Sequence, residues 1–98
     1  MSPLPPRTRI KICGLTREAD LDAAVEAGAD AVGFVLYPKS PRAIAPERAA
    51  VLAARLPPFV TPVLLFVDAQ PAEAIAALAR VPGAICLLYT SDAADDTP

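Results

Sequence analysis

Histidine and tryptophan are absent from this 98-residue sequence, and cysteine occurs only twice, as Cys13 and Cys86. Without histidine, two cysteines so far apart in the chain provide neither a Cys/His cluster for zinc nor a disulfide framework. Aromatic side chains are scarce as well, at three Phe and two Tyr, so many core positions must be filled by small side chains that each bury little area. We therefore expect no metal site.

Long apolar runs are also missing. No stretch of the sequence approaches the roughly 18 residues that a membrane-spanning helix requires. The first seven residues contain no hydrophobic segment of the kind found in secretory signals. These two absences predict a cytoplasmic protein without a membrane partner.

The charge pattern gives no sign of a nucleic-acid partner. The net charge is −2, and three of the eleven acidic residues, Asp92, Asp95 and Asp96, lie in the last seven positions. Lysine and arginine are scattered singly, with no basic stripe and no interleaved aromatic residues. Nucleic-acid surfaces need such a stripe, so we expect none here.

The residues that are present alternate between strand and helix patterns. Apolar or alternating runs predict strands over 9–13, 31–36 and 63–67 and the start of a fourth strand at Ala84. Between them, apolar residues at helical spacing predict three helices, with Gly28, Pro57-Pro58 and Pro82-Gly83 as stop signals. Strands that alternate with helices form βαβ units around a parallel sheet.

Several details of these helices can be predicted. Thr16 suits the N-cap of the first helix, and Pro46 suits the first turn of the second. The third helix is predicted from the helical spacing of Pro71, Ile75, Leu78 and Ala79. Asp68, just before that helix, is assigned to its capping loop.

Periodicity leaves two architectures open, a segment of a (β/α)8 barrel or a doubly wound sheet. No G-x-G-x-x-G or G-x-x-x-x-G-K-[ST] pattern follows any of the predicted strands. This absence argues against the usual dinucleotide-binding and nucleotide-binding sites, and we expect no cofactor.

In either architecture, ligands gather at the carboxyl ends of the strands. Cys13 lies at such an end and is a candidate catalytic residue, although a free cysteine more often fills a small apolar space in a core.

Two motifs at these strand ends resemble the phosphoribosylanthranilate isomerases. Lys11 to Gly14 match the K-I-C-G motif of that family, and Gly33 to Arg42 match its G-F-x-x-x-x-K-S-P-R motif. Weaker similarity extends the resemblance over residues 9 to 85. The resemblance implies a (β/α)8 TIM barrel, of which this chain would form the first three βα units and the start of the fourth strand, since a full barrel takes at least roughly 200 residues.

The resemblance also implies roles for particular residues. The substrate would be the small phosphosugar N-(5-phosphoribosyl)anthranilate, which the family converts by an Amadori rearrangement in tryptophan biosynthesis. Cys13 would be the general base, and Arg42 would bind the anthranilate carboxylate. Lys11 points to the same strand face as Cys13 and either favours its thiolate and contacts substrate or fills a polar layer of the barrel interior. The family's acid lies on a later strand.

The resemblance ends near Cys86, which predicts three parts: a flexible extension over 1–8, a partial barrel over 9–85 and an unrelated tail over 86–98, attributed to truncation or a sequence artefact. By itself such a chain is expected to be inactive and to associate with itself through open sheet edges. The alternative is a non-catalytic α/β assembly or interaction module that uses those edges to bind another chain.

Overall fold

A computed structural model describes residues 8–90 of the chain. The elements follow in the order β1 (Lys11–Cys13), α1 (Glu18–Glu26), β2 (Ala31–Val35), α2 (Pro46–Ala53), β3 (Thr61–Val67), α3 (Pro71–Arg80) and β4 (Ile85–Tyr89). The predicted alternation of three βα units and a fourth strand is confirmed. Residues 1–7 of the predicted extension and residues 91–98 of the predicted tail lie outside the described part. Within residues 8–90, no helix combines the length and the hydropathy of a membrane span.

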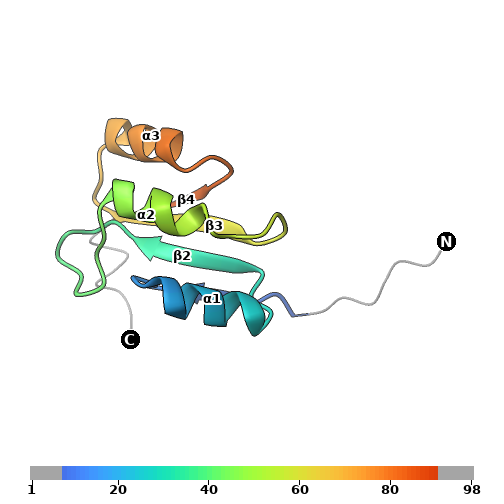
Figure 1. Cartoon of the computed structure of the whole chain (residues 1–98). Helices are drawn as coiled ribbons and strands as arrows, with labels where there is room; N and C mark the ends of the chain where they lie inside the picture. The colour runs from blue at the N-terminus through green and yellow to red at the C-terminus, as the bar shows by residue number, and fades with distance from the viewer. Residues whose placement is uncertain (1–7, 91–98) are drawn as a thin grey trace.

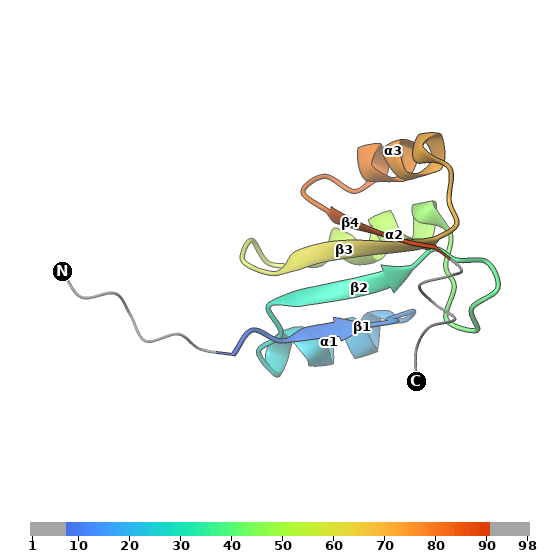
Figure 2. The ribbon, with the colours of Figure 1, turned by 180° about the vertical axis from the view of Figure 1, so that it is seen from behind.

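The four strands form one parallel sheet in the sequential order β1-β2-β3-β4. All three helices lie on the same face of this sheet, in front of it in Figure 1 and behind it in Figure 2. A doubly wound sheet carries helices on both faces, whereas a barrel carries them on its outside only. The arrangement therefore decides between the two architectures in favour of a barrel segment.

The main core lies between the helices and the sheet. Alternate strand residues face the helices, and those of the two central strands are almost fully buried, as are the helix residues that meet them. These core residues include Leu21, Val32, Phe34, Leu52, Leu64 and Phe66. Their burial follows from the period of two along a strand combined with the apolar stripe of a helix.

The other face of the sheet is covered only at its centre. The register aligns Lys11 with Ala31 and Cys13 with Gly33, so these residues share that face. Val35 and Val63 are buried there, whereas Ile85 at the β4 edge is 53% exposed. In a closed barrel this face is the packed interior.

Ion pairs connect neighbouring helices outside the core. Arg48 of α2 binds both carboxylate oxygens of Glu18 in α1, at 2.7 and 2.8 Å, and also donates to the Thr16 carbonyl oxygen at 3.2 Å. The Arg48 hydrogen bonds lower the pKa of Glu18 from 4.5 to about 2. Arg55, just after α2, pairs with Asp22 of α1, and Arg80 of α3 pairs with Glu47 of α2.

One predicted cap was wrong. Asp68 lies in the loop that precedes α3, whose N-cap residue is Gln70, but the N-cap residue of α1 is Arg17 in place of Thr16. The Thr16 carbonyl oxygen instead accepts a hydrogen bond from Arg48. Pro46, in contrast, begins α2 as predicted.

The third helix is confirmed over Pro71–Arg80, but only part of its apolar set faces the sheet. Leu78 packs against the core, whereas Ile75 is 68% exposed. The buried residues are Ala74 and Ala77, with Val81 just beyond the helix.

Candidate active site

The carboxyl ends of β1 and β2 bring the two predicted motifs together. Gly14 follows β1 with a φ of +84°, and its N–H donates to the Gly33 carbonyl oxygen at 2.9 Å. A Cβ atom added to Gly14 would lie 2.6 Å from Nη1 and 2.8 Å from Cζ of Arg42. The Arg42 guanidinium thus lies directly against the backbone of the residue that follows Cys13.

A short loop after β2 holds Arg42 in this place. Its two ends stay beside β2, because the Ile44 N–H donates to the Val35 carbonyl oxygen at 2.9 Å and Val35 pairs with Ala43. Within the loop, the Ser40 N–H donates to the Tyr37 carbonyl oxygen at 3.0 Å, and the Arg42 N–H donates to the Ser40 hydroxyl oxygen at 3.1 Å. These turns, together with the fixed φ angles of two prolines at positions 38 and 41, limit how far the loop can move.

Arg42 differs in its partners from four other arginines within residues 8–90. Arg17, Arg48, Arg55 and Arg80 each form an ion pair with a carboxylate. Among residues 8–90, no carboxylate pairs with the guanidinium of Arg42, which is exposed. A guanidinium without a carboxylate partner among residues 8–90 can hold an external carboxylate with two hydrogen bonds.

Cys13 and Cys86 occupy different faces of the sheet. Cys13 is a half-buried free thiol on the face that the helices do not cover. Cys86 lies in β4, packs against the helix-facing core, and burial raises the pKa of its thiol. Cys86 lies within the strand predicted to begin near Ala84, and Cys13 is the cysteine that precedes Gly14.

Lys11 lies one pleat before Cys13 on the same face, as predicted, and its side chain is exposed. In the part of the chain that the structure describes, no hydrogen bond or ion pair links Lys11 to Cys13 or to Arg42. The structure therefore places Arg42 against Gly14, the residue after Cys13, and leaves Lys11 at the amino end of β1.

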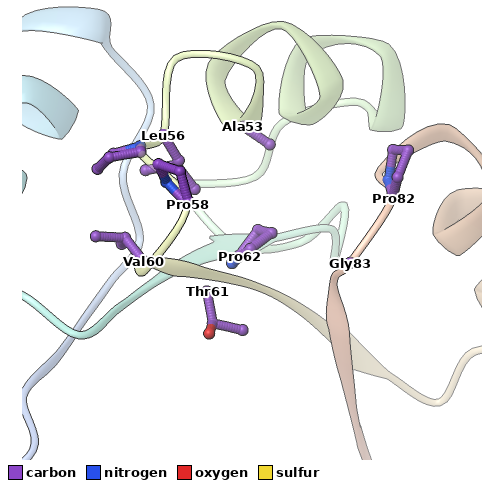
Figure 3. A pocket seen from close by; sticks show the side chains of 9 residues that line it. Ala53, Leu56, Pro58, Val60, Thr61, Pro62, Pro82 and Gly83 are labelled. Carbon is purple, nitrogen blue, oxygen red and sulfur yellow. The ribbon is translucent and has the colours of Figure 1, made fainter.

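One cavity of about 240 Å³ lies at the opposite end of the sheet. Figure 3 shows its lining of apolar side chains and prolines, among them Leu56, Pro58, Pro62 and Pro82. Thr61 opens β3 and Gly83 precedes β4, so this cavity belongs to the amino ends of the strands. It is remote from Cys13 and carries no reactive side chain.

Within residues 8–90, no group of three or more His, Cys, Asp or Glu side chains lies close enough together to hold a metal ion.

Sequence reasoning missed the structural part that Gly14 plays. The motif containing Gly14 was recognised, but only the structure shows that its positive φ and its missing side chain let Arg42 approach. A glycine directly after a strand is a signal for such a conformation. It does not indicate which distant side chain will fill the space.

Comparison with known proteins identifies the relatives of this chain, although no family model matches it. It is 64% identical over 92 residues to N-(5'-phosphoribosyl)anthranilate isomerase from Methylibium petroleiphilum and 53% identical over 94 residues to the enzyme of that name from Leptothrix cholodnii. Each match covers at least 94% of this chain but only 41% of the relative. The chain thus spans less than half the length of these relatives.

The boundary predicted at residue 86 falls inside β4 and stays a prediction. β4 pairs with β3 through Tyr89. The Leptothrix cholodnii match, at 94 of 98 residues, also runs past residue 86.

Solved structures agree in fold. Phosphoribosylanthranilate isomerase in complex with reduced 1-(o-carboxyphenylamino)-1-deoxyribulose 5-phosphate matches with a TM-score of 0.82 and 41% identity, over 94% of this chain and 45% of the other. The Thermotoga maritima enzyme matches with the same TM-score over 42% of its length. The chain therefore belongs to the phosphoribosylanthranilate isomerase family, and its sheet and helices form part of that family's TIM barrel.

Proposed function

We propose that this chain contributes the general base and the carboxylate-binding residue of an enzyme that isomerises N-(5-phosphoribosyl)anthranilate to 1-(2-carboxyphenylamino)-1-deoxyribulose 5-phosphate in tryptophan biosynthesis. The observation that carries the proposal is the position of the Arg42 guanidinium against Gly14, directly after Cys13. The relatives named above carry this activity in their names. One solved relative binds a reduced form of the proposed product.

In this reaction, an acid protonates the ribose ring oxygen and the ring opens to an imine. A base then removes the proton from the adjacent sugar carbon, and the resulting enamine tautomerises to the ketone. The base must reach that proton and must be partly deprotonated near the working pH. A cysteine can meet both requirements as a thiolate, and we assign this step to Cys13, which acts without forming a covalent bond to substrate.

We assign Arg42 to the anthranilate carboxylate of the substrate. Its guanidinium has no carboxylate partner within residues 8–90, and the loop that carries it is fixed at both ends. A bound carboxylate would therefore lie near Gly14, at the end of the strand that carries Cys13. Lys11 is assigned a secondary part, in which its positive charge on the same face favours the thiolate and contacts the substrate.

The test is isomerase activity in a joined protein, in which residues 1–85 of this chain precede the remaining strands of the Methylibium petroleiphilum relative. We expect turnover in the joined protein and none in the 98-residue chain, because proton transfer needs both groups and a fixed substrate. Replacement of Cys13 by alanine in the joined protein should lower kcat by about 10²- to 10⁴-fold, the usual contribution of a general base.

The matched control is Val51→Ala in the same joined protein, because the Val51 side chain is 54% exposed on α2 and its loss should not affect turnover. A joined protein that melts cooperatively but has no activity would overturn the proposal. Full activity in the Cys13→Ala variant would overturn the assignment of the base.

A second candidate function rests on the sheet edges. Three large apolar side chains of β4, Ile85, Leu88 and Tyr89, are between 43% and 58% exposed. Such an edge pairs readily with another strand, which would make the 98-residue chain self-associating or a non-catalytic binding module. Sedimentation of this chain over a range of concentrations tests this candidate, and a compact monomer that melts cooperatively would contradict it.

A further inference from the structure

We propose that Gly33 is a positioning residue of the site: its missing side chain provides the space that holds the Cys13 sulfur in place. The inference rests on the proposed function, since it concerns how the Cys13 thiol is positioned as the general base. Gly33 lies in β2, directly across from Cys13 in the parallel register. A Cβ atom added to Gly33 would lie 2.8 Å from Sγ of Cys13 and 3.3 Å from both its Cα and its Cβ.

The backbone gives no other reason for glycine at this position. Gly14, Gly28 and Gly83 have φ angles between +80° and +98°, a region that other residues rarely adopt. Gly33 is absent from this set and has an ordinary strand conformation, which any residue could adopt. Glycine inside a strand weakens it and often marks a close approach of another group, and here that group is the Cys13 thiol.

The neighbours of Gly33 show that the gap is local. Ala31 and Val35 share its face of β2 and carry side chains, and Val35 is only 6% exposed. Gly33 itself is buried. The only space along this face of β2 that lacks a side chain is thus the one occupied by the sulfur of Cys13.

Filling the space should redirect the thiol before it disrupts the fold. The Cys13 side chain has a single torsion, so its sulfur can avoid a new methyl group only by moving to another staggered position. That movement displaces the sulfur by more than an ångström relative to a substrate held by Arg42. Misplacement of a reacting group by about 1 Å can cost about 100-fold in rate.

The experiment introduces Gly33→Ala into the joined protein and measures both kinetics and thiol chemistry. We expect kcat to fall by about 100-fold with a smaller change in KM, because the Arg42 contact is retained. The rate at which iodoacetamide alkylates Cys13, followed by mass spectrometry on the peptide that contains it, should change over pH 6 to 10. Unchanged kcat together with an unchanged alkylation profile would overturn the proposal.

A double variant keeps the test decisive if Gly33→Ala fails to fold. In Cys13→Ala the sulfur is gone, so the added methyl group has one fewer atom to displace. We expect Gly33→Ala to lower the melting temperature less in this background than in the protein that retains Cys13. Equal losses in both backgrounds would contradict a role in seating the sulfur.

The readouts also separate this proposal from the proposed function. If Cys13→Ala alone retained full turnover, the base assignment would fail. The alkylation profile and the melting comparison would still decide whether Gly33 positions the thiol.

Discussion

The two faces of the sheet differ in how completely they are covered and in what they carry. On the helix-facing side, Phe34 and Leu64 are fully buried. On the other side only the centre is buried, Lys11 is exposed and Cys13 is half-buried. Packing that stabilises the described residues is thus concentrated on one face, and the candidate chemistry lies at the end of the other. A change on one face should therefore affect stability and a change on the other should affect reactivity.

The largest effect we expect comes from a pair of neighbours in β3. Leu64 points to the helices with no exposed surface, and Leu65 points to the partly covered face and is half-buried. Leu64→Ala should cost about 2–5 kcal/mol in the free energy of unfolding, because it leaves a cavity in a closed core. Leu65→Ala should cost less in the 98-residue chain, since its neighbourhood can collapse or admit water. Urea denaturation of both variants measures the difference.

The same pair in the joined protein sharpens the comparison. There the remaining strands close the barrel and cover the face of Leu65, so the cost of Leu65→Ala should approach that of Leu64→Ala. Equal costs in the 98-residue chain itself would show that the second face is already closed, by self-association or otherwise.

Arg42→Ala should have the next largest effect. A hydrogen bond to a charged group contributes about 1.5–3 kcal/mol, so loss of the carboxylate contact should raise KM of the joined protein by about 10- to 150-fold with little change in stability. The neighbouring cation Lys39 is exposed in the same loop, and Lys39→Ala serves as the control. Similar KM values for the two variants would show that Arg42 has no special contact with substrate.

Gly14→Ala refines this prediction. It should strain the backbone, because φ is +84°, and displace the guanidinium that lies 2.6 Å from the new Cβ atom. Gly83→Ala is the matched control, since φ is +80° there and no heavy atom lies within 4 Å of the new Cβ. Both variants should lose similar stability, but only Gly14→Ala should raise KM. A rise in both would assign the effect to strain alone.

Much of the fold could be predicted from sequence because local signals agreed. Pro46 marked the start of α2, and the continuous apolar run beginning at Ala31 marked a strand buried between its neighbours. The buried face of α3 could not be predicted, because Ala74 and Ala77 pack closely on the sheet while the larger Ile75 faces away from it. Alanine gives a weak hydrophobic signal, so a helix that packs through alanines is easily assigned the wrong face.

The site was predictable only in part, for a different reason. Cys13 and Arg42 stood out through the resemblance to a known family, and the alternation along β1 placed Lys11 on the face of Cys13. The proximity of Arg42 to Gly14, and of the Cys13 sulfur to Gly33, depends on contacts between β1, β2 and the loop after β2. Nothing local in the sequence encodes these contacts, because in each case the space left by a glycine is filled from another segment.

The smallest effect we expect concerns the pH dependence of the helix layer. Hydrogen bonds from Arg48 lower the pKa of Glu18 to about 2, against 4.5 for the free group. A carboxylate with a lowered pKa in the folded state stabilises that state above pH 4.5, and its contribution is lost as the pH falls from 4.5 towards 2. Because both side chains are more than a third exposed, the effect should be modest and should weaken as salt is added. Glu18→Gln should lower the melting temperature at pH 7 and should have the same melting temperature as the unmodified chain near pH 2.

Glu26→Gln, at the end of the same helix, is the control and should leave the melting temperature nearly unchanged at both pH values. If Glu18→Gln melted like the unmodified chain at pH 7, its ion pair would contribute nothing, and the stability of the helix layer would rest on its apolar contacts with the sheet.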